Sequence, residues 1–279
     1  MAQASAMLEA LGLVLTPYSP HLHRDPATKA LKPVGTANRL AMLPTGYLEV
    51  LTPVDGIATP AADHLRACIA RHVGVHLAAF SVADAAARAR ELATAGFTVQ
   101  PPMHLRRSVE AADGREVEVA FTVVRPAFDH FPEGRVQVLT HHTPEHMWQT
   151  RYLPAENAIE SLLEVAYVAD DPPAVADRFS RFLDRPVAEG GPSLIDLDRG
   201  RVRFMSRREA AEAFGARRLP ENPSIGAITL GSRDIDRTRD CFLSGGLHPG
   251  SLGGDHLLID AAEALGVHLV IVPVRGAGG

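Results

Sequence analysis

Hydrophobic and polar residues follow one another along this chain in an order that is repeated three times. Each copy has an apolar strand, an aspartate, an amphipathic helix and then short β runs. The apolar strands with their aspartates are VHLAAFSVAD (75–84), LLEVAYVADD (162–171) and IGAITLGSRD (225–234). An aspartate in this place predicts a helix N-cap, because its side chain accepts a hydrogen bond from a free N–H of the first turn. We therefore expect helices to begin just after Asp84, Asp171 and Asp234.

The segments behind these aspartates have the spacing of helices with one buried face. The apolar positions are Ala86, Ala89, Leu92 and Ala93 in one segment, and Val175, Phe179 and Phe182 in another. Two of the helices end in a glycine before a bulky apolar residue, Gly96-Phe97 and Gly246-Leu247. This pair predicts a left-handed C-cap that leads into a strand.

Short strands are predicted to complete each unit. They lie at 117–124 and 136–140 in the second unit, 194–198 and 201–205 in the third, and 256–260 and 267–272 in the fourth. Additional helices are expected at 61–73 and 209–215.

An incomplete copy stands at the front of the chain. Residues 1–14 predict a helix, and strands are expected at 39–43 and 47–51, with Pro44-Thr45-Gly46 as the turn between them. The strand that should precede this helix is missing from the sequence. A segment rich in Pro, Glu and His (143–157) separates the first two units from the last two. We place a domain boundary there, giving an N-terminal domain at 1–155 and a C-terminal domain at 156–279.

Composition and net charge indicate which classes of binding partner to expect. Of 279 residues, 46% are apolar and 22% charged, which is typical of a globular protein with a full core. The net charge is −5 and the arginines form no basic stripe, so we expect no nucleic-acid partner. No apolar run approaches the ~20 residues of a membrane helix. Cys68 and Cys241 lie far apart in helix-like segments and are expected to be buried free thiols, with a disulfide as the alternative. We predict a cytoplasmic protein that binds a small-molecule substrate, with a homodimer as one compatible assembly.

Three segments resemble a known family: GTANRLAML (35–43) followed by YLEVLTP (47–53), and LTHHTPEHMW (139–148). Together with the repeated units, they are similar to the glyoxalase-like branch of the vicinal oxygen chelate superfamily, which includes bleomycin-resistance proteins and extradiol dioxygenases. The resemblance covers nearly the whole chain. It implies an α+β fold in which paired βαβββ units form two glyoxalase-like open barrels, the first unit lacking its first strand.

The same resemblance implies a metal site in the barrel, with ligands from the first and last strands of each unit. Glu49 occupies a last-strand position and is expected to be a metal ligand or general base, although a solvated strand face would also explain it. His141 ends the matching strand of the second unit. His141 lies four residues after Gln137, so the two side chains are on the same face of the strand. His141 is a second expected ligand, with an exposed histidine as the alternative. His76 is either a third ligand or a hydrogen-bonded core histidine.

Other residues are expected around the ligand. Asn38 and Arg39 are candidate donors to a carbonyl or carboxylate, and Gln137 and Trp148 are candidate substrate contacts, although Trp148 would equally cover the domain junction. His21 and His23 lie in a proline-bounded segment that predicts a loop with exposed histidines, although their H-x-H spacing would suit a metal site if the segment were a strand.

The C-terminal domain offers a poorer ligand set. Glu164 and His268 occupy ligand positions, but their counterparts are Arg203 and Ala227, and arginine does not bind metal ions. We expect Glu164 and Arg203 to form an ion pair or an anion-recognition element. The missing first strand would have supplied a further ligand to the N-terminal domain, so either the chain starts late or its metal site is degraded.

Three functional hypotheses follow. The first is a metal-dependent lyase, isomerase or dioxygenase, in which a divalent ion (Zn, Fe, Ni or Mn) polarises two neighbouring substrate oxygens. The second is a metal-free small-molecule binding protein that sequesters its ligand as bleomycin-resistance proteins do. The third is a homologue without a retained site. We favour the enzyme, because Glu49, Gln137 and His141 are expected to converge.

Overall fold

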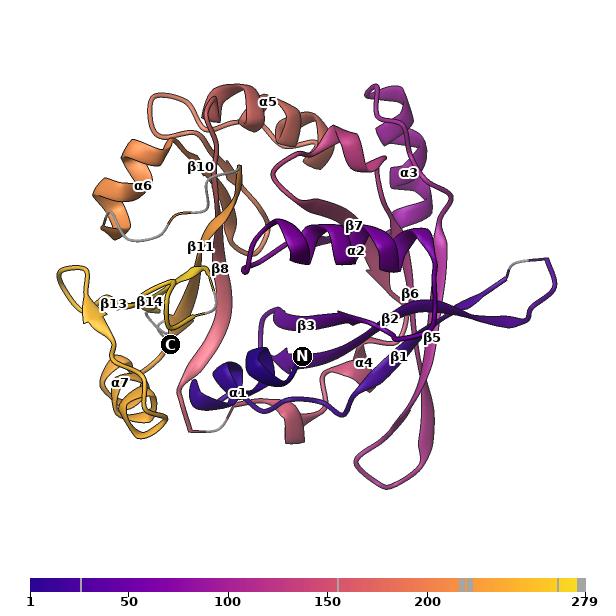
Figure 1. Cartoon of the computed structure of the whole chain (residues 1–279), viewed down its shortest axis with the longest axis horizontal. Coiled ribbons are helices and arrows are strands. Elements are labelled where there is room, and N and C mark those ends of the chain that lie inside the picture. Colours follow the sequence, from indigo (N-terminus) through magenta and orange to yellow (C-terminus); the bar gives the residue numbers. More distant parts are fainter. Residues whose placement is uncertain (26, 155, 216–218, 220–222, 265, 275–279) are drawn as a thin grey trace.

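Two mixed β-sheets with helices packed on them make up the chain (Figure 1). This computed structural model describes residues 1–25, 27–154, 156–215, 219, 223–264 and 266–274. The predicted α+β class with paired βαβββ units is confirmed. The predicted domain boundary falls at Ala155, outside the described residues. Strands of the first sheet come from residues before it, and those of the second sheet from residues after it.

The first sheet, which we call sheet A, curls into a half-barrel. Its order is β3-β2-β1-β5-β6-β7-β4. The strands are β1 (Ser19–Arg24), β2 (Leu31–Met42), β3 (Tyr47–Pro53), β4 (Leu77–Ser81), β5 (Met103–Glu110), β6 (Glu116–Val124) and β7 (Arg135–His141).

The second sheet, sheet B, has the order β12-β13-β14-β11-β8-β10-β9. The strands are β8 (Ile159–Val168), β9 (Leu194–Asp196), β10 (Arg201–Met205), β11 (Ser224–Ser232), β12 (Gly250–Ser251), β13 (Leu257–Ile259) and β14 (His268–Pro273).

Apart from a short helix at Pro144–Met147, in the segment predicted to separate the two halves of the chain, the helices lie where the sequence pattern places them. They are α1 (Ala2–Ala10), α2 (Pro60–Arg71), α3 (Ala85–Thr94), α4 (Pro144–Met147), α5 (Pro172–Leu183), α6 (Arg207–Phe214) and α7 (Ile235–Ser244), with 3-10 turns at Phe128–His130 and Thr150–Tyr152. Asp84, Asp171 and Asp234 each cap a helix, accepting hydrogen bonds from the backbone N–H groups of Ala87, Ala174 and Arg237. Gly96 and Gly246 have φ angles of 89° and 80°, as the predicted left-handed caps require. No helix in the described part of the chain is long and apolar enough to cross a membrane.

Strand pairing shows which strand the first unit lacks. In the other three units the first strand pairs in parallel with the last one: β4 with β7, β8 with β10, and β11 with β14. Within the described residues, no strand stands in that place beside β3. Sheet B joins its two units through the antiparallel pair β8–β11, whereas sheet A joins its units through β1–β5. The prediction that the first unit lacks its opening strand is therefore confirmed.

The loop predicted around His21 is wrong. Residues 19–24 form β1, which hydrogen-bonds to both β2 and β5. Strand β5 was not predicted either, and β2 begins well before residue 39. These strands do not show alternating apolar residues in the sequence. Some of the side chains that point into the sheet's concave face are polar, including His21 on β1 and Arg107 on β5.

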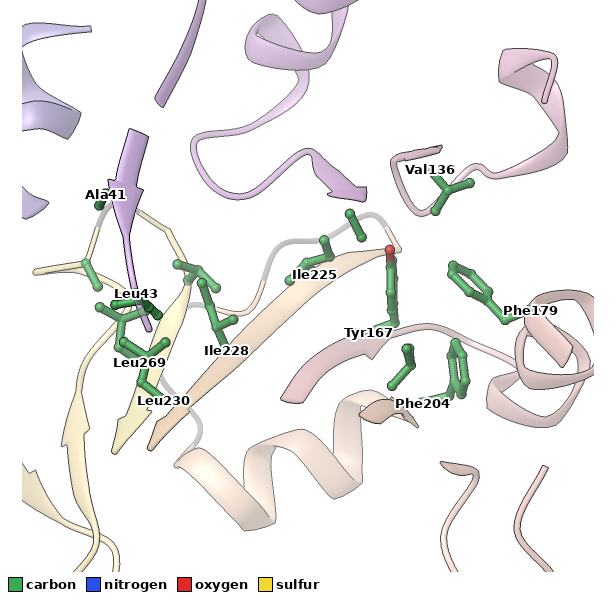
Figure 2. Packing of buried hydrophobic residues seen from close by; sticks show 14 of the residues in the cluster. Ala41, Leu43, Val136, Tyr167, Phe179, Phe204, Ile225, Ile228, Leu230 and Leu269 are labelled. Carbon is green, nitrogen blue, oxygen red and sulfur yellow. The ribbon is translucent and has the colours of Figure 1, made fainter. Parts of the chain in front are cut away.

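The two sheets share one hydrophobic core. Figure 2 shows Leu43, at the end of the β2 segment, among Ile228, Leu230 and Leu269 of sheet B, in a cluster that also contains Val136 and Phe179. The rings of Phe131 and Phe179 lie 5.0 Å apart across the junction. Because both halves bury side chains in this cluster, sheet A packs directly against sheet B.

Candidate functional site

A pocket lies on the concave face of sheet A. Its empty volume is about 600 Å³, which includes its opening to solvent. Strands β1 to β7 and helix α2 all contribute side chains to its wall. The polar and charged residues that line it are His21, Thr36, Asn38, Tyr47, Glu49, Arg107, Arg125, Arg135, Gln137 and His141.

Strand alternation explains why these side chains point to one place. On β7, Arg135, Gln137, Leu139 and His141 are two residues apart and share a face. On β3, Tyr47, Glu49 and Leu51 do the same. The curl of the sheet turns both faces toward the same space.

A hydrogen-bond chain fixes the carboxylate of Glu49. The Asn38 Nδ2 group donates to Glu49 Oε1 at 2.6 Å, and Arg107 Nη1 donates to Asn38 Oδ1 at 2.8 Å. The guanidinium thus sets the orientation of the amide, and the amide holds the carboxylate. Glu49 keeps 21% of its side chain exposed, so it can contact a ligand in the pocket.

His21 stands next to this chain as a neutral base. Its Nδ1 lies 2.9 Å from Thr36 Oγ1, and its Nε2 lies 4.0 Å from Glu49 Oε1. Burial, followed by the positive charge of Arg107, lowers the pKa of His21 to about 3. The imidazole is therefore uncharged at neutral pH.

Three arginines bring positive charge into the pocket. Arg107 and Arg135 are buried, with 8% and 5% of their surface exposed, and Arg125 is partly buried. Arg125 donates through Nε to Gln137 Oε1 at 2.9 Å and through Nη1 to Met103 Sδ at 3.0 Å, both uncharged acceptors. Burial, and then the nearby Arg135, lowers the pKa of Arg125 to about 9, so it remains charged at neutral pH. None of the three forms an ion pair with a carboxylate of the described residues.

Several nitrogens in the pocket have no hydrogen-bond partner among the described protein atoms. They are His21 Nε2, Arg107 Nε, Arg135 Nε, Arg135 Nη1 and His141 Nε2, and all are buried. A buried polar group without a partner costs about 1–3 kcal/mol. Such groups gathered in one pocket indicate a place that a polar ligand completes.

In sheet B, by contrast, a buried carboxylate is paired with arginines of the same sheet. Glu164 is 6% exposed and accepts hydrogen bonds from Arg201 Nε at 2.6 Å and Arg203 Nη2 at 3.0 Å. The predicted contact between Glu164 and Arg203 is present, and the carboxylate is neutralised within the protein. The charge left unpaired therefore lies in sheet A.

Aromatic side chains close the end of the pocket at His141. The His141 ring lies 6.0 Å from Tyr47 and 5.2 Å from Trp148, both in edge-on contact. Burial, followed by the charge of Arg199, lowers the pKa of His141 to about 4. Trp148 packs behind this wall and donates from Nε1 to the Leu43 carbonyl at 3.1 Å.

The structure brings together only part of the expected site. Asn38, Glu49, Gln137 and His141 line the pocket. Arg39 is on the other face of β2, where it bonds the Thr16 carbonyl and pairs with Glu9. His76 is not among the lining residues, and its ring packs against His72 at 4.3 Å. The roles predicted for these residues stay predictions.

Arg107, Arg125 and Arg135 were not among the expected site residues, and His21 was expected in an exposed loop. A regular spacing was present on β7, where Arg135, Gln137 and His141 alternate with apolar residues. An arginine in a strand usually faces solvent, so this spacing alone does not indicate a pocket.

The residues of the pocket do not fit the metal site that the resemblance implies. In the described part of the chain, no three His, Cys, Asp or Glu side chains are grouped so as to hold a metal ion. Glu49 and His141 line the pocket without His76, and three guanidinium groups line the same pocket. Guanidinium nitrogens donate hydrogen bonds and do not coordinate metal ions.

Comparisons with known proteins agree with this architecture. The profile of a protein family described as "Glyoxalase-like domain" matches residues 1–183. No curated protein matches the chain. Among solved structures, a hypothetical protein from Staphylococcus aureus is similar, with a TM-score of 0.58 and 11% identity over 92% of this chain and 89% of that one.

Two further solved structures share the fold. A mutant of 4-hydroxymandelate synthase from Streptomyces coelicolor has a TM-score of 0.58 and 13% identity, covering 100% of this chain and 90% of that one. A xylose isomerase-like TIM barrel/4-hydroxyphenylpyruvate dioxygenase fusion protein has a TM-score of 0.58 and 12% identity, covering 100% of this chain and 47% of that one. At these identities the similarity is one of fold alone.

Proposed function

The chain belongs to the glyoxalase-like domain family, and we propose that the pocket of sheet A binds a small organic anion through Arg107, Arg125 and Arg135. One observation carries the proposal: three guanidinium groups line the pocket and one carboxylate, Glu49, lines it with them. Guanidinium groups remain charged in proteins, and an uncompensated buried charge is costly. An anionic ligand removes that cost when it binds.

The chemistry of the donors supports an oxyanion as ligand. Planar guanidinium groups match carboxylates and phosphates, to which they donate paired hydrogen bonds. Arg135 has two nitrogens without a protein partner, and Arg107 has one. These are the groups that would hold the ligand. This proposal corresponds to the metal-free binding hypothesis and differs from it in asking for a charged ligand.

A second candidate function is a lyase or isomerase reaction in the same pocket. The observation that favours it is the setting of Glu49, which Asn38 fixes beside the arginines while part of the carboxylate stays exposed. In this candidate, Glu49 takes a proton from the bound acid, and the arginines stabilise the negative charge that develops. A metal-dependent reaction would need ligands beyond the group that Glu49 and His141 provide.

Thermal unfolding of the purified protein tests the binding proposal. A panel of small carboxylic acids is compared with the amides of the same acids, which have the same shape and no charge. We expect the acids to raise the Tm in a concentration-dependent way and the amides to leave it unchanged. Equal effects of acids and amides, or no effect of either, would contradict the proposal.

A further inference from the structure

The charges in the pocket divide into a compensated group and an uncompensated one. Arg107 and Glu49 are joined through Asn38, which accepts from the guanidinium and donates to the carboxylate. Their opposite charges offset one another across one side chain. Arg125 and Arg135 have no such partner.

Arg125 and Arg135 are close enough to affect one another. Arg125 directly follows β6 and Arg135 begins β7, which is paired with β6, and the charge of Arg135 is the main electrostatic influence on Arg125 after burial. Arg125 donates hydrogen bonds to the side-chain oxygen of Gln137 and the sulfur of Met103, and neither acceptor carries charge. Two adjacent positive charges therefore face the pocket with no negative charge of their own.

We infer that the ligand presents a dianionic group to Arg125 and Arg135, as a phosphate monoester or a malonate-like dicarboxylate does. Three positive charges against the one negative charge of Glu49 leave two to be neutralised. A monoanion would leave one buried guanidinium uncompensated, which is unfavourable. This inference rests on the proposed function and adds the charge of the ligand to it.

Groups from every element around the two arginines leave the charge of the pocket constant near neutral pH. His21 on β1 and His64 on α2 have their pKa values lowered to about 3 and about 4 by burial and by the arginines. Burial raises the pKa of the Cys68 thiol on α2, and lowers the pKa of His141 on β7 to about 4. Glu49 on β3 and Arg107 on β5 are the remaining charged groups. The ionisation of the ligand is then what changes between about pH 5 and about pH 7, where a phosphate monoester gains its second charge.

Isothermal titration calorimetry on the full chain tests the inference. The probes are methyl phosphate and malonate as dianions, and methyl sulfate and acetate as monoanions. We expect at least one dianion to bind about tenfold or more tightly than both monoanions at neutral pH. If methyl phosphate is that dianion, its affinity rises about tenfold from about pH 5 to about pH 7, following its second ionisation, while that of methyl sulfate stays constant.

Single substitutions test whether Arg125 and Arg135 produce the preference for a dianion. Arg125→Gln and Arg135→Gln are expected to reduce the preference for the dianion to about twofold or less. Arg106→Gln is the matched control, because Arg106 is next to Arg107 on β5, points to the other face and lies 3.8 Å from Glu118. It should retain the preference. A preference that survives in both pocket variants would overturn the inference.

The outcomes separate this inference from the proposed function. Monoanions that bind as tightly as dianions would leave anion binding intact and reject the dianion. Binding of none of the four probes, together with no Tm shift from the acid panel, would reject both.

Discussion

Asn38 donates a hydrogen bond to Glu49 Oε1 at 2.6 Å, while its own oxygen accepts one from Arg107. One buried amide therefore links the negative and positive charges of the pocket. Asn38 is only 3% exposed, so neither contact has water as a ready substitute. This link makes the arrangement of the site sensitive to a single side chain.

Asn38→Leu should destabilise the protein. The substitution keeps the side chain's approximate size but leaves Arg107 Nη1 and Glu49 Oε1 without their partner, at a cost of about 1–3 kcal/mol. The free energy of unfolding, measured in urea, would report it. Arg106→Gln is the control, since Arg106 is next to Arg107 on β5 and faces away from the pocket. Equal stability of Asn38→Leu and wild type would contradict the linking role.

Arg135→Met should stabilise the protein in the absence of ligand. Replacing an unpaired buried guanidinium by an apolar chain of similar length removes a charge that the protein does not compensate. We expect a gain of about 1–4 kcal/mol in the free energy of unfolding.

The opposite sign is expected in sheet B. Glu164→Gln removes the charge that pairs with Arg201 and Arg203, both of which remain partly exposed, so a loss of about 1–3 kcal/mol is expected. The free energies of unfolding of Arg135→Met and Glu164→Gln, measured in urea, are each compared with that of the wild type. A destabilised Arg135→Met would indicate that this arginine is paired within the protein.

Glu49→Gln should tighten anion binding and remove any proton transfer. The substitution deletes the only negative charge among the lining residues while an amide can still meet Asn38. At separations of a few ångströms, with partial screening, the affinity for an anion should increase about tenfold. Calorimetry with malonate measures this change. Weaker binding would mean that Glu49 itself holds the ligand.

Metal content separates the binding proposal from the metal-dependent hypothesis. Because three guanidinium groups line the same pocket as Glu49 and His141, we expect purified protein to contain well under one equivalent of Zn, Fe, Ni or Mn, and added ions to leave its Tm unchanged. Elemental analysis of the wild type and Glu49→Ala provides the test. About one equivalent of metal in the wild type, lost in Glu49→Ala, would restore the metal site.

His21 should make the protein acid-sensitive. Its pKa falls from 6.5 to about 3 on folding, so the unfolded chain binds a proton that the folded one refuses between these values. The resulting stability is complete above about pH 6.5 and is lost as pH falls toward 3, by about 1.4 kcal/mol per pH unit at most.

His21→Gln should flatten that pH dependence of the free energy of unfolding between about pH 6 and about pH 4. His23→Gln, on the same strand, is the matched control. An unchanged pH dependence in His21→Gln would show that His21 is protonated in the folded protein as readily as in the unfolded one.

The repeated fold was predictable because its determinants are local. Asp84, Asp171 and Asp234 cap the helices that follow them, and of the apolar strands before them β11 is almost wholly buried, whereas β4 buries only Ala78. Strands β1 and β5 were not predicted, since His21 and Arg107 take inward positions that an apolar residue would hold in an ordinary core.

The site was predictable only where a family position marked it. Asn38, Glu49, Gln137 and His141 were named and do line the pocket. Arg107, Arg125 and Arg135 were not, because the curl of sheet A decides whether an arginine in a strand faces solvent or a cavity. That curl depends on pairings such as β1 with β5, which join residues more than eighty positions apart.

The affinity for malonate across four single variants tests the central claim most directly. Calorimetry would compare the wild type with Arg107→Gln, Arg125→Gln, Arg135→Gln and the outward-facing control Arg106→Gln. We predict that each pocket variant binds about tenfold or more weakly, as expected for losing a charged hydrogen bond, and that the control stays within about twofold of the wild type. Affinities that are the same in all four variants and the wild type would contradict an anion site built from these arginines.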